Sequence, residues 1–206
     1  MFLIFSTLLS CMLPFVEYAS RVDIQRDWEL QISRKESSRR LRRFLRTVEK
    51  DNHIDPRILA LAWIESRLRI NVERGDRGRA CGVFQIHARY SHPLLRRPQG
   101  FRGWVEEDES EVIEEECSKL EDHRYSVGTV RRLLSMMDER ELHPCHHNSG
   151  WVGACNRWYK ERLDFWISFF ASAQFYCNHL EEMSDANEEN RGSGSDRADS
   201  DGSGIP

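Results

Sequence analysis

The sequence lacks a net positive charge, an internal repeat and a Cys-x-x-Cys pair. With a formal net charge of −4, its overall composition gives no indication of nucleic acid as a partner. Without Cys-x-x-Cys, the usual spacing of a structural zinc site is absent. Because no repeat and no second domain can be recognised, the 206 residues are predicted to form one ordinary domain with extensions.

An apolar stretch runs from Phe2 to Val16 and is too short for a comfortable membrane-spanning helix. It resembles the core of a secretory signal with a cleavage site at residues 18–20, although no Lys or Arg precedes it. The letters LLSC also resemble a lipoprotein box with Cys11 lipidated; the stretch could also be an uncleaved anchor or a buried N-terminal helix. We predict that residues 1–20 are a signal peptide or membrane anchor. The protein would then be exported, periplasmic or membrane-anchored, with an N-terminus able to contact a membrane surface.

The chain has six cysteines, of which five remain if Cys11 leaves with a signal. An odd number fits one or two disulfides with a thiol left over, and the pairing cannot be read from the sequence. One cluster could bind zinc or contain a Cys145–Cys155 disulfide. Its members are His143, Cys145, His146, His147 and Cys155. Because the usual zinc spacing is missing and His147 belongs to another motif, we predict no metal and no cofactor.

The charges of the chain are segregated. Residues 34–46, RKESSRRLRRFLR, are strongly basic, and residues 106–116, EEDESEVIEEE, contain no basic residue. The acidic run is expected to be solvated, or else to pair with the basic segment. Residues 21–50 are predicted to form a basic amphipathic helical extension that touches anionic lipid or wall polymer, or that packs on the domain with a solvated face. Its apolar stripe consists of Leu41, Phe44, Leu45 and Val48.

The pattern beyond residue 50 predicts a mainly α domain over residues 51–182. Asp55 is placed to cap a helix that has Pro56 at its first position and runs to about Arg69. Further helices are expected from Ser110, after Tyr125 and over residues 156–180. The second of these has one apolar face made of Val127, Val130, Leu133, Leu134 and Met137. The last segment, 183–206, is polar and rich in Gly and Ser, so it is predicted to be disordered.

Glu65 stands out because it lies within an apolar helical stretch, next to Trp63. A carboxylate is costly to bury unless it is paired or protonated. A protonated acid beside an aromatic ring is suited to general acid catalysis near neutral pH. The alternative is a surface Glu65 that pairs with Arg69, four residues along the same helix.

Three short elements then follow in order: Glu65-Ser66, the segment CGVFQI at 81–86, and HHNSG at 146–150. With the helix around Gly128 between the last two, this order resembles the soluble lytic transglycosylases and the related goose-type lysozymes. The resemblance covers about residues 50–170 and implies a lysozyme-like α (α+β) fold with a short irregular or β segment after the catalytic helix. The chain departs from the family at His147, where the family has a tyrosine.

The resemblance implies Glu65 as the catalytic acid and base. It implies a sugar-binding site formed by Ser66, Gly82, Gln85, Ile86, His147, Asn148 and Gly150. Gly82 would let the backbone approach a sugar, and Gln85 and Asn148 would offer hydrogen bonds to it. The expected partner is the glycan strand of peptidoglycan, whether of the cell's own wall or of a phage's host.

The reaction implied is cleavage of the β-1,4 bond between MurNAc and GlcNAc with formation of a 1,6-anhydro ring. A goose-type lysozyme would instead use Asp76 or Glu73 to activate water, and these helper carboxylates are the first alternative. Exposed loop charges beside Arg74 and Arg77 are the simpler interpretation of both, which favours the transglycosylase. A wall-binding or virion protein without catalytic activity is the second alternative.

Overall fold

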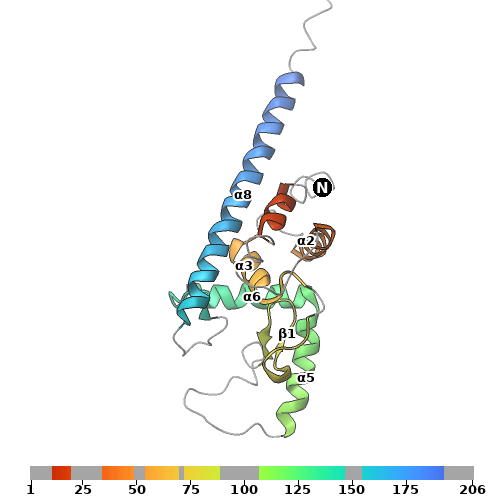
Figure 1. Cartoon of the computed structure of the whole chain (residues 1–206), viewed down its shortest axis with the longest axis vertical. Helices are drawn as coiled ribbons and strands as arrows, with labels where there is room; N and C mark the ends of the chain where they lie inside the picture. Colours follow the sequence, from red (N-terminus) through yellow and green to blue (C-terminus); the bar gives the residue numbers. More distant parts are fainter. Residues whose placement is uncertain are drawn as a thin grey trace, which may run out of the picture.

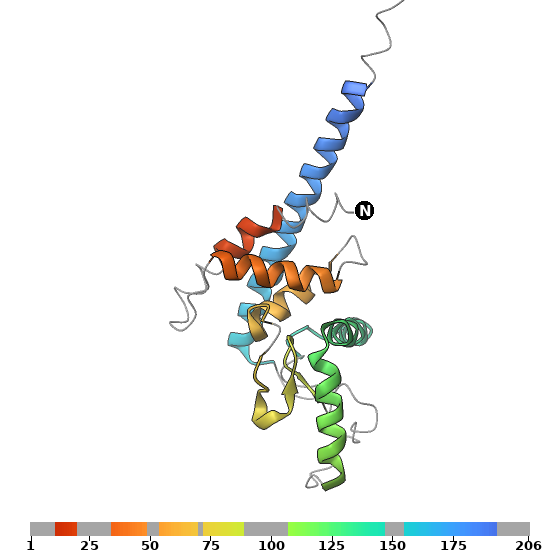
Figure 2. The ribbon, with the colours of Figure 1, turned by 90° about the vertical axis from the view of Figure 1, so that its right-hand side faces the viewer.

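The computed structural model describes residues 11–19, 34–48, 54–69, 72–88, 107–146 and 155–192. As predicted, this part of the chain is mainly helical, with one small antiparallel sheet (Figures 1 and 2). The elements are α2 (Arg34–Val48), α3 (Pro56–Ser66), η1 (Asp76–Gly78), β1 (Ala80–Cys81), β2 (Ile86–His87), α5 (Glu107–Glu121), α6 (His123–Asp138) and α8 (Arg157–Gly192).

The centre of the core is the contact between α3 and α8. α3 begins as predicted, because the side chain of Asp55 accepts a hydrogen bond from the backbone N–H of Arg57 and Pro56 takes the first turn. The middle of α3, from Ile58 to Trp63, is fully buried, and the ring of Trp63 lies 5.6 Å from that of Trp166. α8 packs here through an apolar stripe at helical spacing: Tyr159, Leu163, Trp166, Phe170, Ala173 and Cys177.

Residues 11–19 form a helix that packs on α8 (Figure 2). Met12, Val16 and Ala19 are buried in the same core as α3. A disulfide joins Cys11 to Cys177 of α8. The other cysteines pair as Cys81–Cys117 and Cys145–Cys155, so no thiol is left over. The predicted Cys145–Cys155 alternative is therefore the one present, and the expected odd thiol is absent because Cys11 has a partner.

α2 covers Arg34–Val48 of the predicted span 21–50, and residues 21–33 and 49–50 lie outside the described residues. Leu41, Phe44 and Leu45 are buried in the core. Arg39, Arg42 and Arg46 are exposed on the opposite side. α2 therefore has the form of the packed alternative, a helix of the domain with a solvated basic face.

α5 begins at Glu107, three residues before the cap predicted at Ser110. Ser110 is thus inside the helix, which the preceding acidic residues extend at its N-terminal end, where negative charge is favourable. Glu114 and Glu121 form ion pairs with Arg74, which lies in the loop between α3 and η1. Of the two, only Glu114 belongs to the acidic run 106–116, and it pairs with Arg74 and not with α2, the alternative partner expected for that run.

α6 follows α5 after a sharp corner, where the side chain of Asp122 caps the new helix by accepting hydrogen bonds from the N–H groups of Arg124 and Tyr125. The apolar face predicted for this helix is confirmed. All five of its members are buried: Val127, Val130, Leu133, Leu134 and Met137.

The hairpin β1–β2 pairs Cys81 with Ile86 and fits the predicted short segment after the α3 helix. Gly82 follows β1 with a φ of +72°, a backbone conformation that favours glycine. A Cβ at this position would lie 2.1 Å from the carbonyl oxygen of Leu120. The turn therefore packs directly on the corner between α5 and α6, and the Cys81–Cys117 disulfide holds it there.

α8 continues to Gly192, well past the predicted boundary at residue 183. Residues 183–191 contain good helix formers and no Gly or Pro, so the helix can extend beyond the packed core. The predicted disorder of this stretch is therefore wrong in part; residues 193–206 lie outside the described residues. Within the described ranges, no helix has the length and apolar character that crossing a membrane requires.

Candidate active site

Glu65 lies in the last turn of α3 and is partly exposed to solvent. The hydroxyl of Tyr159, from the first turn of α8, donates a hydrogen bond of 2.5 Å to its Oε1 atom. A hydroxyl bonded to a carboxylate gives the shorter and stronger class of hydrogen bond. The packing of α3 on α8 thus fixes the position of the carboxylate while leaving it open to solvent.

The neighbours of Glu65 differ from those predicted. Trp63 turns into the core, where its ring contacts Trp166 and Phe170. The predicted pair with Arg69 is also replaced, because the Nε atom of Arg69 donates to the carbonyl of Ser66. The partner of Glu65 is therefore a residue ninety-four positions away along the chain.

Tyr159 is the site residue that sequence reasoning missed. Burial, together with the neighbouring Glu65, raises the pKa of its hydroxyl well above the usual value, so that it remains a donor through the neutral range. The signal that could have found it is the buried stripe of α8, which begins at Tyr159 and continues four residues on at Leu163. A tyrosine on a buried face needs a partner for its hydroxyl.

The chain turns sharply directly after Glu65 and Ser66. The N–H of Arg67 bonds the carbonyl of Trp63, and the N–H of Leu68 bonds that of Ala62, so two backbone carbonyls near the end of α3 are satisfied within the turn. Arg67 and Leu68 both have positive φ, 55° and 59°, a conformation in which a side chain is strained.

Two further contacts fix this helix end. The Arg67 guanidinium donates to the carbonyls of Trp63 and Ile64, at 2.7 and 2.9 Å. The Ser66 hydroxyl, which is buried, donates to the carbonyl of Ala62. Ser66 thus holds the local shape of the turn that carries Glu65, and its contact with a sugar remains a prediction.

Gln85 is engaged within the hairpin loop. Its Oε1 accepts from the N–H of Gly75 at 2.9 Å, and its Nε2 donates to the carbonyls of Gly82 and Glu73. These bonds close the loop between η1 and the hairpin and use both amide hydrogens. The contact of Gln85 with a sugar therefore remains a prediction, with one acceptor lone pair available for it.

Gly82 and Ile86 take structural positions in the same hairpin. The α-hydrogen side of Gly82 faces Leu120 and Ser126, so that helix packing, and not only the approach of a sugar, requires glycine here. Ile86 is buried and belongs to the core. These two residues place the hairpin against α5 and α6.

The two predicted helper carboxylates lie on the hairpin loop. Glu73 is exposed, and Asp76 begins η1, where its Oδ2 lies 3.0 Å from Nε2 of His87. Both views place η1 at the end of the hairpin away from α3 (Figures 1 and 2). Glu65, in α3, and Asp76, in η1, are thus carried by separate elements.

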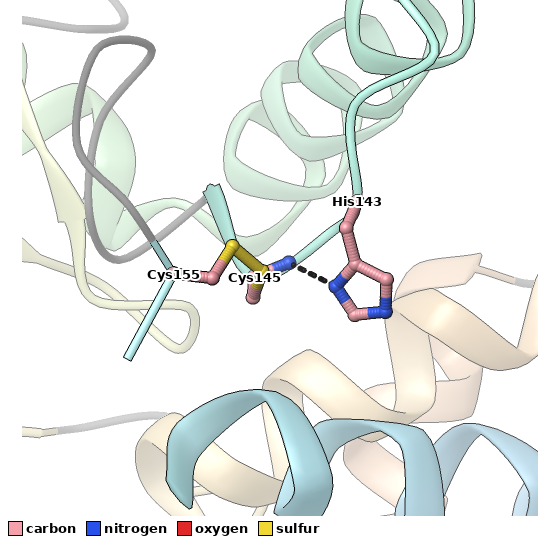
Figure 3. Close-up of side chains that lie close together, drawn as sticks. All are labelled: His143, Cys145 and Cys155. Carbon is pink, nitrogen blue, oxygen red and sulfur yellow. Dashed lines mark hydrogen bonds between the residues drawn. A yellow bond between two sulfur atoms is a disulfide. The ribbon is translucent and has the colours of Figure 1, made fainter. Parts of the chain in front are cut away.

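The remaining predicted residues, His147, Asn148 and Gly150, lie outside the described residues. The Cys145–Cys155 disulfide closes the segment that contains them. His143 precedes it and makes two hydrogen bonds. Its Nδ1 accepts from the N–H of Cys145 (Figure 3). Its Nε2 lies 2.6 Å from Oδ1 of Asp164 in α8.

His143, Cys145 and Cys155 bring three donor atoms within 4.8 Å of one another, a spacing that could hold a metal ion. The two sulfur atoms are joined to each other, however, and zinc needs free thiolates. Both nitrogens of His143 also have partners. The arrangement as it stands is a braced turn, which connects α6 to the start of α8 close to where Tyr159 reaches Glu65.

Comparison with known proteins adds no relative to this description. No protein-family profile, no curated protein and no solved structure matches the chain. Function must therefore be argued from the residues and their geometry.

Proposed function

We propose that this protein is a peptidoglycan lytic transglycosylase with a lysozyme-like domain, in which Glu65 is the sole general acid and base. The observation that carries the proposal is the Glu65 carboxylate at the end of a buried helix, partly open to solvent and held by the Tyr159 hydroxyl. The order of the helix, the hairpin and the following helices agrees with the sequence resemblance.

In the proposed reaction, Glu65 donates its proton to the glycosidic oxygen, and the bond to C1 of MurNAc breaks through an oxocarbenium-like transition state. The ionised Glu65 then accepts the proton of the MurNAc 6-hydroxyl as that oxygen attacks C1. The product is a 1,6-anhydro ring, Glu65 returns to its protonated form, and no water is consumed.

Tyr159 serves this cycle as a positioning residue. Its hydroxyl remains protonated while Glu65 changes state, so it can bond the carboxylate formed after the first step. The family's tyrosine is His147 in this chain, and Tyr159 offers a hydroxyl to Glu65 from another element. We infer that Tyr159 supplies the support that His147 does not.

The contact that Asp76 makes favours the transglycosylase over a hydrolase that would use this carboxylate. A hydrolase needs a second carboxylate close enough to activate water on the sugar. Asp76 faces His87 instead, on the far part of the hairpin. The three disulfides agree with export to an oxidising compartment such as the periplasm, where peptidoglycan is the expected partner.

The test is mass spectrometry of fragments released from purified peptidoglycan by the wild type, Glu65→Gln and Glu116→Gln. Glu116 is a matched control because it is also hydrogen-bonded to a tyrosine but is fully buried. Anhydro fragments from the wild type and from Glu116→Gln, but not from Glu65→Gln, support the proposal. Reducing MurNAc ends would indicate the lysozyme-like hydrolase. No release by any of the three would indicate a wall-binding protein without catalytic activity.

A further inference from the structure

We propose that the N-terminal helix, residues 11–19, remains in the mature folded protein and is held covalently on α8 by the Cys11–Cys177 disulfide. Of the four possibilities that the sequence allows for this segment, a removed signal and a lipidated Cys11 are incompatible with that bond. Retention of the helix is independent of the enzymatic activity proposed above.

The contacts of the segment are those of an internal helix of the domain. Met12, Val16 and Ala19 are each at most 1% exposed. They recur every three or four residues, so they form one face of the helix. A removable leader has no need of such a face, whereas a permanent helix buries it against the body.

Aromatic side chains extend this interface along α8. The Phe15 ring lies 6.1 Å from Phe169 and 5.9 Å from Tyr176, and Tyr18 stacks on Phe169 at 6.0 Å. Cys11 meets Cys177 farther along the same helix. Residue numbers increase along the N-terminal segment while those of its contact partners in α8 decrease. The two helices therefore run antiparallel and are in contact from residue 11 to residue 18.

Removal of residues up to the expected cleavage site would therefore take away part of the core. Cys177, which is buried, would lose its partner, and Phe169 would lose the two rings that this segment packs against it. These residues share α8 with Tyr159, so the helix that positions the Glu65 carboxylate would lose its packing on one side.

The bond also consumes the one sulfur atom that lipidation would need. The two thiols form a disulfide by losing two electrons and two protons to a disulfide oxidant, which becomes a dithiol. With its sulfur in this bond, Cys11 cannot carry a thioether-linked lipid. The proposal thus requires an oxidant of that class in the compartment where the protein folds.

The full chain, produced with its own N-terminus in an exporting bacterial host, tests this directly. Protein from the envelope fraction is alkylated, digested with trypsin without reduction and analysed by mass spectrometry. The expected product is peptide 1–21 linked to peptide 163–191, which contain Cys11 and Cys177 respectively. A chain that begins near residue 20, a lipid on Cys11, or alkylated Cys11 and Cys177 would each overturn the proposal.

A second measurement uses the trypsin site at Arg21 in the otherwise intact protein. After brief trypsin treatment, the wild type should keep the N-terminal peptide until a reductant is added, whereas Cys11→Ser should lose it once denaturant is added without reductant. The double variant Cys145→Ser/Cys155→Ser is the matched control and should behave as the wild type. Equal loss from the wild type and Cys11→Ser would show that the segment is not covalently held.

Discussion

Among the residues that the structure describes, two glutamate–tyrosine pairs are hydrogen-bonded, and they are built in opposite ways. At the α3–α8 contact, the tyrosine is buried and Glu65 reaches solvent. At the α5–α6 corner, Glu116 is fully buried, and its partner Tyr125 is 38% exposed. The same pair of groups can therefore serve two purposes, depending on which member faces the solvent.

The difference separates a reactive carboxylate from a structural one. A substrate can reach Glu65 while a rigid hydroxyl holds it from behind. Glu116 cannot meet a substrate, because every face of it is covered, so its bond with Tyr125 serves to satisfy a buried polar group. In both cases the tyrosine lies in the first turn of its helix and donates to a glutamate of another helix, and exposure distinguishes the two pairs.

The largest expected effect is on activity, and it should distinguish the two carboxylates. Glu65→Gln should lower the rate of fragment release from peptidoglycan by about 10²–10⁴-fold, since it removes the general acid and base. Glu116→Gln should leave the rate per folded molecule within about twofold, because that carboxylate touches no substrate. Equal losses in the two variants would contradict the assignment of roles.

Gly82→Ala tests how the hairpin is seated on the α5–α6 corner. We expect a loss of about 2–4 kcal/mol in the free energy of unfolding, because the new Cβ meets a backbone carbonyl and the positive φ is strained. Urea unfolding followed by circular dichroism measures it.

Gly128→Ala is the matched control for that substitution. Gly128 lies inside α6, where a Cβ meets nothing within 4 Å. This variant should gain about 0.5–1 kcal/mol from helix propensity. A loss at Gly128 as large as that at Gly82 would remove packing on Leu120 as the explanation.

The two tyrosine hydroxyls should separate stability from activity. Tyr125→Phe removes the partner of a buried carboxylate and should cost about 2–3 kcal/mol of stability. Tyr159→Phe leaves Glu65 in contact with water, so it should cost less stability but about tenfold in rate, equivalent to about 1.4 kcal/mol. Urea unfolding and the fragment-release assay, applied to both variants, give the two readouts.

The stability of the protein at alkaline pH should reveal the contribution of the two tyrosine hydroxyls. The pKa of Tyr159 is raised well above 10.0, chiefly by burial, and that of Tyr125 is raised by burial and by its bond to Glu116. As the pH rises, these tyrosines therefore ionise in the unfolded chain before they ionise in the folded protein. The stability that the protonated hydroxyls contribute is complete below about pH 10 and decreases as the pH rises above that value. The stability of the wild type should therefore fall more steeply above about pH 10 than that of Tyr159→Phe.

The smallest effect concerns the turn that leads into α8. Burial alone would raise the pKa of Asp164, but hydrogen bonds from Lys160 and His143 outweigh it and lower the pKa below 3.8. The stability from Asp164 is thus present above that pH and is lost as the pH falls through the lowered pKa. Asp164→Asn should lower the melting temperature by at most a few degrees at neutral pH, as is usual for exposed pairs. The difference in melting temperature between Asp164→Asn and the wild type should become smaller at acidic pH.

The local features of the fold could be predicted from the sequence. The start of α3 at Asp55 and Pro56 depends on one cap and one proline, and the buried face of α6 depends on spacing within a single helix. The position of Glu65 within a helix follows from local residues for the same reason, while its role remains a prediction. Such features are determined by residues a few positions apart.

The partners of these elements could not be predicted, because they come from distant parts of the chain. Tyr159 meets Glu65, Cys11 meets Cys177 and Gly82 meets Leu120 only after the helices have packed. No periodicity contains that information. The apolar N-terminus resembles an export signal for the same reason: an apolar helix face has the same composition whether it binds a membrane or a core.

The disulfides also determine what a protease could achieve. The Cys81–Cys117 bond joins the two ends of the segment between these residues, and the Cys11–Cys177 bond joins positions 166 residues apart. A single cut anywhere between Cys81 and Cys117 leaves two fragments that are still joined by both bonds. A cut between Cys145 and Cys155 is bridged in the same way. An oxidised molecule nicked in either place therefore stays in one piece, and Glu65 and Tyr159 remain parts of a single covalent body.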